Sequence, residues 1–119
     1  PDWQVRRNAA KSLALQANTA AVEPLIQAVT DDHWQVRKFA LQALQKTPDN
    51  RALSCLIQAL TDEYSDVRRD AAIALGLLKN PAALQALQQA LDDPDRDVCI
   101  YTERAIQKIQ DSMQGTLNA

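Results

Sequence analysis

The chain has little of what strands and tight turns require. Its 119 residues include two glycines, and aromatic residues make up 4% of the sequence. Aromatic and β-branched residues favour strands, whereas alanine and leucine favour helices. Alanine and leucine supply most of the 46% of residues that are hydrophobic. The composition therefore excludes a sheet-rich fold and favours an all-α protein.

Residues that carry metal or nucleophilic chemistry are equally scarce. The chain has one histidine, His33, so it cannot build a multi-histidine metal site or a Cys/His zinc site. Its two cysteines, Cys55 and Cys99, stand at unrelated places in the sequence pattern and are interpreted as reduced thiols. We expect His33 to cap a helix, and we predict neither a catalytic site nor a metal or cofactor.

The chain also lacks long apolar runs and an excess of positive charge. No stretch approaches the roughly 20 apolar residues of a membrane span, and no signal-peptide pattern is present. The net charge is −2, whereas nucleic-acid binders usually carry a basic face. These features predict a cytoplasmic protein that binds neither membranes nor nucleic acid.

What the sequence does contain is a repeat of 31 residues. Four valines mark it without a slip in register: Val5, Val36, Val67 and Val98. The segments "AAVEPLIQAVTDD", "RALSCLIQALTDE" and "PAALQALQQALDD" repeat between them. Fixed periods of 20–50 residues indicate stacked-repeat proteins. We therefore expect the four valines to be buried in equivalent environments.

Each unit is predicted to contain two helices. Apolar residues recur at positions i, i+3, i+4 and i+7, which places them on one buried face of a helix. The expected first helices span 20–30, 50–61 and 81–91, and the expected second helices span 4–17, 33–46, 64–79 and 95–112. The sequence thus predicts an open, right-handed α-solenoid of about three and a half helix pairs over residues 1–112, followed by a flexible tail, 113–119. Because the chain begins at a second helix, we expect it to be the C-terminal part of a longer protein.

One unit carries a family resemblance. Residues 62–93, "DEYSDVRRDAAIALGLLKNPAALQALQQALDD", resemble the HEAT-like repeats of the phycobilisome-lyase type. That family includes bilin lyase subunits, phycobilisome-degradation factors and scaffolds. The last unit departs from the pattern, since Cys99, Thr102 and Glu103 replace arginine and two alanines. We interpret it as a C-terminal cap whose outer face meets water.

The resemblance implies a structural ladder of charged residues along the turns. Asp31 and Arg37 stand six residues apart, and so do Asp62 and Arg68. Each guanidinium would bridge a carboxylate of its own unit and the turn of the next unit. On this interpretation Arg6 lacks a partner.

A column of cations is formed by the residues that directly follow the repeat arginines. Arg7, Lys38 and Arg69 each follow a repeat arginine, about 200° around the helix from the valine, so they point away from the core. In this fold class the second helices line the concave face, where such a column could hold an acidic partner segment. The alternative is an ordinary solvated helix face.

All five aromatic residues fall at the first turns of the second helices: Trp3, Trp34, Phe39, Tyr64 and Tyr101. They form either a binding ridge or packing between units. We expect Trp3 and Trp34 to be neighbours along one edge, with Trp34 partly exposed. Because Ser65 and Arg96 occupy the same repeat position later, the ridge should stop after the second unit.

These observations predict a non-catalytic protein–protein interaction scaffold that docks a protein on its concave face. The resemblance leaves open a bilin lyase or phycobilisome-handling subunit. In that case the groove would hold a tetrapyrrole or its phycobiliprotein carrier.

Overall fold

The computed structural model describes residues 2–16 and 19–118. These residues form helices and connecting turns, with no strand among them. Four long helices alternate with three short ones. The long helices are α1 (Asp2–Gln16), α3 (Trp34–Lys46), α5 (Ser65–Leu78) and α7 (Arg96–Asn118).

Each short helix begins with one turn of 3-10 helix. The turns cover Thr19–Ala21, Asn50–Ala52 and Pro81–Ala83, and they lead into α2 (Val22–Ala28), α4 (Leu53–Ala59) and α6 (Leu84–Ala90). Asp49 and Asn80 cap the second and third turns by accepting the N–H of the residue two positions on. The predicted helix pairs are therefore present, with shorter first helices than expected.

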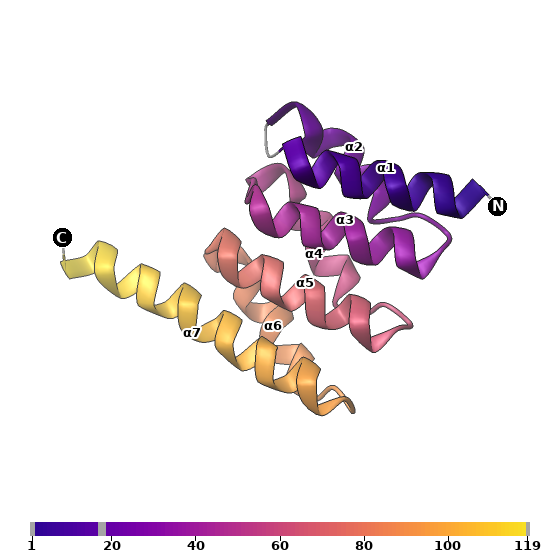
Figure 1. The fold of residues 1–119 in the computed structure, drawn as a ribbon. Coiled ribbons are helices and arrows are strands. Elements are labelled where there is room, and N and C mark those ends of the chain that lie inside the picture. The colour runs from indigo at the N-terminus through magenta and orange to yellow at the C-terminus, as the bar shows by residue number, and fades with distance from the viewer. Residues whose placement is uncertain (1, 17–18, 119) are drawn as a thin grey trace.

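The helices form two layers (Figure 1). The long helices lie side by side in chain order from α1 to α7, and the short helices lie behind them. Consecutive long helices contact each other, and each short helix packs on the long helix that follows it. The molecule is an α-solenoid, in which each unit buries its apolar stripe against its neighbours. We call the outer surface of the long-helix layer the long-helix face.

Val5 does not follow its repeat equivalents into the core. Val36, Val67 and Val98 are at most 1% exposed, whereas Val5 is 70% exposed. The buried valines lie on helices that pack against a preceding short helix, α2, α4 or α6. Among the described residues no helix precedes α1, so the prediction of four equivalent environments is wrong for Val5.

The C-terminal unit ends in a longer helix than predicted. α7 continues to Asn118, so residues 113–118 of the predicted tail are helical. Ala119 lies outside the described residues. Thr102, the repeat equivalent of Ala71, is fully buried, and its hydroxyl has no hydrogen-bond partner among the described residues.

Candidate interaction surface

Three arginines join consecutive units through carboxylates 25 residues ahead. The Nε atom of Arg6 lies 2.6 Å from a carboxylate oxygen of Asp31. The equivalent Nε–carboxylate distances are 2.7 Å for Arg37 with Asp62 and 2.7 Å for Arg68 with Asp93. In each pair a second guanidinium nitrogen donates to the other carboxylate oxygen. We call these six residues the arginine ladder.

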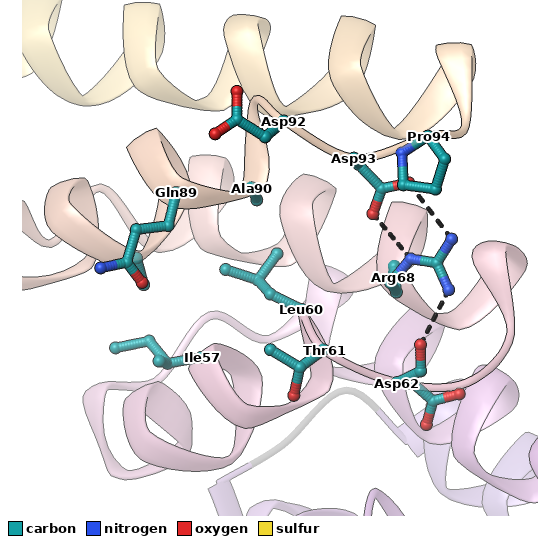
Figure 2. A pocket seen from close by; sticks show the side chains of 11 residues that line it. Ile57, Leu60, Thr61, Asp62, Arg68, Gln89, Ala90, Asp92, Asp93 and Pro94 are labelled. Carbon is teal, nitrogen blue, oxygen red and sulfur yellow. Dashed lines mark hydrogen bonds and ion pairs between the residues drawn. The ribbon is translucent and has the colours of Figure 1, made fainter.

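The turns hold both ends of the second and third rungs in place. Asp62 accepts the backbone N–H of Tyr64 at 2.9 Å, and Asp93 accepts that of Asp95 at 2.8 Å. At its other end Arg68 donates to the carbonyl oxygen of Asp62 at 2.8 Å (Figure 2). The guanidinium groups of Arg37 and Arg68 therefore each satisfy a carbonyl of their own turn and a carboxylate of the next turn.

The ladder corrects three sequence-based interpretations. The contact of Arg37 with Asp31 is to the backbone carbonyl, at 2.9 Å, and the carboxylate partner comes from the next unit. Arg6, expected to lack a partner, is paired with Asp31. Asp93 was missed, although the recurring 25-residue Arg–Asp spacing could have indicated it. Cys99 replaces arginine in the last unit, and its thiol donates to the Asp93 carbonyl at 3.0 Å.

The ladder also sets the ionisation of Asp31. Partial burial on its own would raise the pKa of this carboxyl. The hydrogen bonds from Arg6 and from the backbone N–H of His33 outweigh burial, so the pKa of Asp31 lies below its usual value. Asp31 therefore stays ionised, as a charged rung requires.

Open cavities lie beside the ladder on the side of the short helices. One of about 460 Å³ lies between α4 and α6 and includes Arg68, Asp62 and Asp93 in its lining (Figure 2). An equivalent cavity of about 360 Å³ lies one unit earlier and includes Arg37. Apart from Asp92 in the first cavity and Asp32 in the second, the charged lining groups are engaged in the ladder, so we assign the ladder residues to structure.

The column of Arg7, Lys38 and Arg69 lies along the crevices between long helices. Arg7 donates to the side-chain oxygen of Gln35 on α3 at 3.2 Å. Lys38 lies 3.8 Å from a carboxylate oxygen of Asp66 on α5. All three cations are only partly exposed. The column is therefore present on the long-helix face, tethered by polar neighbours.

A buried aspartate that sequence analysis did not single out lies beside this column. Asp70 is 3% exposed and accepts a hydrogen bond from Gln42 at 3.2 Å. Gln45 donates to its backbone carbonyl at 3.0 Å, and Nε of Arg69 lies 3.5 Å from its carboxylate. Burial raises the pKa of Asp70 against the opposing effect of Arg69. The sequence offered one signal for this buried residue: Asp70 stands at the repeat position that Phe39 and Tyr101 occupy in other units.

Four rings form a continuous row at the N-terminal ends of the long helices. Trp3 stacks on His33 with ring centroids 3.9 Å apart and planes 2° apart. Trp34 stacks on Tyr64 at 5.2 Å, and His33 lies 6.4 Å from Trp34. We call Trp3, His33, Trp34 and Tyr64 the aromatic edge. His33 also accepts the Gln35 N–H through Nδ1 at 3.2 Å, so it does cap α3 as expected.

The aromatic edge differs from the predicted ridge. His33 lies between the two tryptophans, and Tyr64 carries the row into the third unit. Each tryptophan stands two residues before a repeat valine. It stacks on the ring that stands three residues before the next repeat valine, so Trp3 pairs with His33 and Trp34 with Tyr64. At the third interface these positions hold Ser65 and Asp95, so the row ends there. Trp34 is partly exposed, as expected.

Phe39 and Tyr101 lie apart from this edge. Lys11 on α1 lies 4.8 Å above the ring of Phe39, and Arg104 lies 5.1 Å above the ring of Tyr101. The predicted site residues therefore separate into an aromatic edge at the start of the long helices and two aromatic–cation pairs further along them.

Comparison with known families agrees with this architecture. The family model for HEAT repeats matches residues 1–74 and 49–107. The chain belongs to the HEAT-repeat family. Among curated proteins, none matches it. The family match does not specify the phycobilisome-lyase type of HEAT repeat.

Several solved structures share the fold of these HEAT repeats. Human deoxyhypusine hydroxylase in complex with glycerol is 28% identical over 87% of this chain and 36% of that chain, with a TM-score of 0.76. An engineered protein from a structural genomics consortium is 26% identical, with a TM-score of 0.74 over 90% of this chain and 57% of that one. A designed armadillo repeat protein in complex with the peptide (KR)4 is 20% identical, with a TM-score of 0.62 over 76% of this chain and 47% of that one.

Two further findings concern the chemistry of the HEAT repeats. Within residues 2–16 and 19–118, no three His, Cys, Asp or Glu side chains are placed to hold a metal ion. No helix in the same ranges is both long and apolar enough to cross a membrane.

Proposed function

We propose that this chain is a non-catalytic scaffold that docks a protein partner on its long-helix face. One observation carries the proposal. Cations gather along the crevices between neighbouring long helices although the chain as a whole has a net charge of −2. They are Arg7, Lys11, Lys38, Lys46, Arg69, Arg104 and Lys108.

The position of the acidic residues explains this separation of charge. The ladder holds Asp31, Asp62 and Asp93 at the turns, away from the crevices. Asp70 lies within the long-helix layer but is buried, and the exposed Asp66 pairs with Lys38 and Arg69. Apart from Asp66, the exposed charge named along the crevices is therefore positive, which favours an acidic partner segment.

The comparisons support docking at the level of the fold. The designed armadillo repeat protein is described in complex with a peptide, (KR)4. A stack of this kind can therefore hold a peptide on its surface. The cations here call for a peptide of the opposite sign.

Catalysis and bilin handling have less support. The chain spans 36% of the deoxyhypusine hydroxylase structure, and its one histidine is already used in capping α3 and stacking on Trp3. Nothing in the comparisons favours the bilin alternative, which remains a prediction from the resemblance.

A display selection tests the docking proposal. Peptides from a random library would be selected on the chain, and the binders measured by fluorescence anisotropy against Trp34→Ala, Lys38→Ala and a control. Arg51→Gln is a matched control because Arg51 is an exposed cation on the side of the short helices. We expect each variant of the long-helix face to weaken binding by at least about 1 kcal/mol, with the control unchanged. Binders that respond only to Arg51→Gln, or an absence of binders, would contradict the proposal.

A further inference from the structure

Two hollows on the long-helix face are repeat equivalents of each other. The first has a volume of about 270 Å³ and is lined by Lys11, Ala14, Leu15, Phe39, Gln42 and Lys46. The second has a volume of about 190 Å³ and is lined by residues 62 positions further on, namely Ile73, Gly76, Leu77, Tyr101, Arg104 and Lys108, together with Ala105. The hollows are therefore two units apart, the first between α1 and α3 and the second between α5 and α7.

Both hollows combine an apolar floor with two cations. Phe39 forms a wall of the first hollow, beside Lys11 and Lys46. Tyr101 forms the equivalent wall of the second hollow, beside Arg104 and Lys108. No acidic side chain is among the lining residues of either hollow. Small-molecule sites usually measure about 300–1,000 Å³. Each hollow is smaller than that and suits a single apolar side chain.

The interface between the two hollows is closed by polar contacts. There α3 meets α5, and Asp70 takes the position of the aromatic wall. Its hydrogen bonds to Gln42 and Gln45 occupy the crevice. The face thus offers two apolar sites with a polar step between them.

The spacing of the hollows suits an extended chain. Packed helices lie about 8–10 Å apart, so two helix steps amount to roughly 16–20 Å. An extended chain rises about 3.3 Å per residue. Two side chains about six residues apart would reach both hollows, whereas a helical segment would need about 12 residues at 1.5 Å each.

We propose that the two hollows form one bipartite site for an extended acidic peptide. The peptide places an apolar side chain in each hollow, about six residues apart, and its Asp or Glu residues meet Lys11, Lys46, Arg104 and Lys108. This proposal rests on the docking function proposed above and specifies the partner of the same face.

Labelled peptides of 14 residues test the site by fluorescence anisotropy. The test peptide carries two leucines six positions apart between glutamates. Comparison peptides carry one leucine, two leucines three apart, or lysines in place of the glutamates. We expect the test peptide to bind about tenfold more tightly than the single-leucine peptide, because a second leucine is buried. We expect the lysine peptide not to bind.

Protein variants locate the bound peptide. Lys46 and Lys108 are exposed, so Lys46→Gln combined with Lys108→Gln should leave the melting temperature unchanged. This double variant should bind the test peptide several-fold more weakly and with less dependence on salt, whereas Arg51→Gln should bind it as before.

Three results would overturn the proposal. They are equal binding of one-leucine and two-leucine peptides, no effect of the double variant, and tighter binding of a single-stranded oligonucleotide of equal charge. If display-selected peptides occupy the long-helix face while the acidic test peptide does not bind, this proposal fails and the scaffold stands. If neither binds, both fail.

Discussion

The Nε atom of Arg68 lies 2.7 Å from a carboxylate oxygen of Asp93 in the next unit, and both side chains are at most 15% exposed. The same guanidinium donates to the carbonyl oxygens of Asp62 and Glu63 in its own turn. One side chain therefore joins two units and satisfies backbone groups that would otherwise lose hydrogen bonds.

Arg68→Ala should lower the free energy of unfolding by about 1–3 kcal/mol, because it leaves the largely buried Asp93 carboxylate without its cation. Arg68→Lys should recover only part of this loss, since an ammonium cannot reproduce the two-pronged contact. Urea unfolding of the three proteins measures the effect. An unchanged midpoint for Arg68→Ala would mean that the rung adds no stability.

Gly76 lies at a close contact between α5 and α7. A Cβ atom added at Gly76 would lie 2.9 Å from the Cα atom of Ala105. Gly76→Ala should therefore destabilise the fold by about 1–3 kcal/mol, although alanine favours helices more than glycine.

Ala14 is the repeat equivalent of Gly76 and provides the matched control. Ala14→Gly changes mainly helix propensity and should cost about 1 kcal/mol. Thermal unfolding of both variants tests this comparison. A rise in melting temperature for Gly76→Ala would show that α7 moves aside without cost.

Thr102→Val should stabilise the protein. Thr102 is fully buried and its hydroxyl has no partner within the part of the chain that the structure describes, whereas the three equivalent positions in the other units hold alanine. Valine keeps the shape and removes the buried polar group, so we expect a gain of about 1–2 kcal/mol. Denaturant unfolding measures this gain, and Glu103→Gln serves as the control at an exposed neighbouring residue. A loss of stability would indicate that the hydroxyl does have a partner in solution.

Cys55 should make stability depend on pH in the alkaline range. Burial raises the pKa of this thiol from 9.0 to about 11. Between these values the unfolded chain loses the proton while the folded chain keeps it, so stability falls as the pH rises. We expect a loss of about 2 kcal/mol between pH 8 and pH 10.5 that Cys55→Ala removes. Equal pH dependence in both proteins would refute the assignment.

The 31-residue register was enough to predict the helix pairs, because helical periodicity and caps are properties of local sequence. It could not predict the exposure of Val5, which depends on whether another helix packs over α1. Nor could it choose between the two partners of Arg37. The sequence-based prediction gave Arg37 a carboxylate of its own unit and the turn of the next unit. The structure has the reverse, a carbonyl of its own turn and a carboxylate of the next unit, because the choice depends on the separation of units in the stack.

The candidate site was predicted in composition and only partly in arrangement. The cations and aromatic residues do lie on the long-helix layer. Trp3 stacks on His33, which stands one residue before Trp34, the repeat equivalent of Trp3. Aligning equivalent positions of the repeat pairs the two tryptophans and therefore misses this offset. The hollows at Phe39 and Tyr101 depend on side chains from two adjacent helices, so neither helix predicts them alone.

The most direct test of the account is where a bound peptide contacts the chain. Backbone amide NMR shifts of the ¹⁵N-labelled protein should be followed while the tightest display-selected peptide is added. We expect the perturbed amides to concentrate in α1, α3, α5 and α7. Perturbations concentrated in α2, α4 and α6 would contradict docking on the long-helix face.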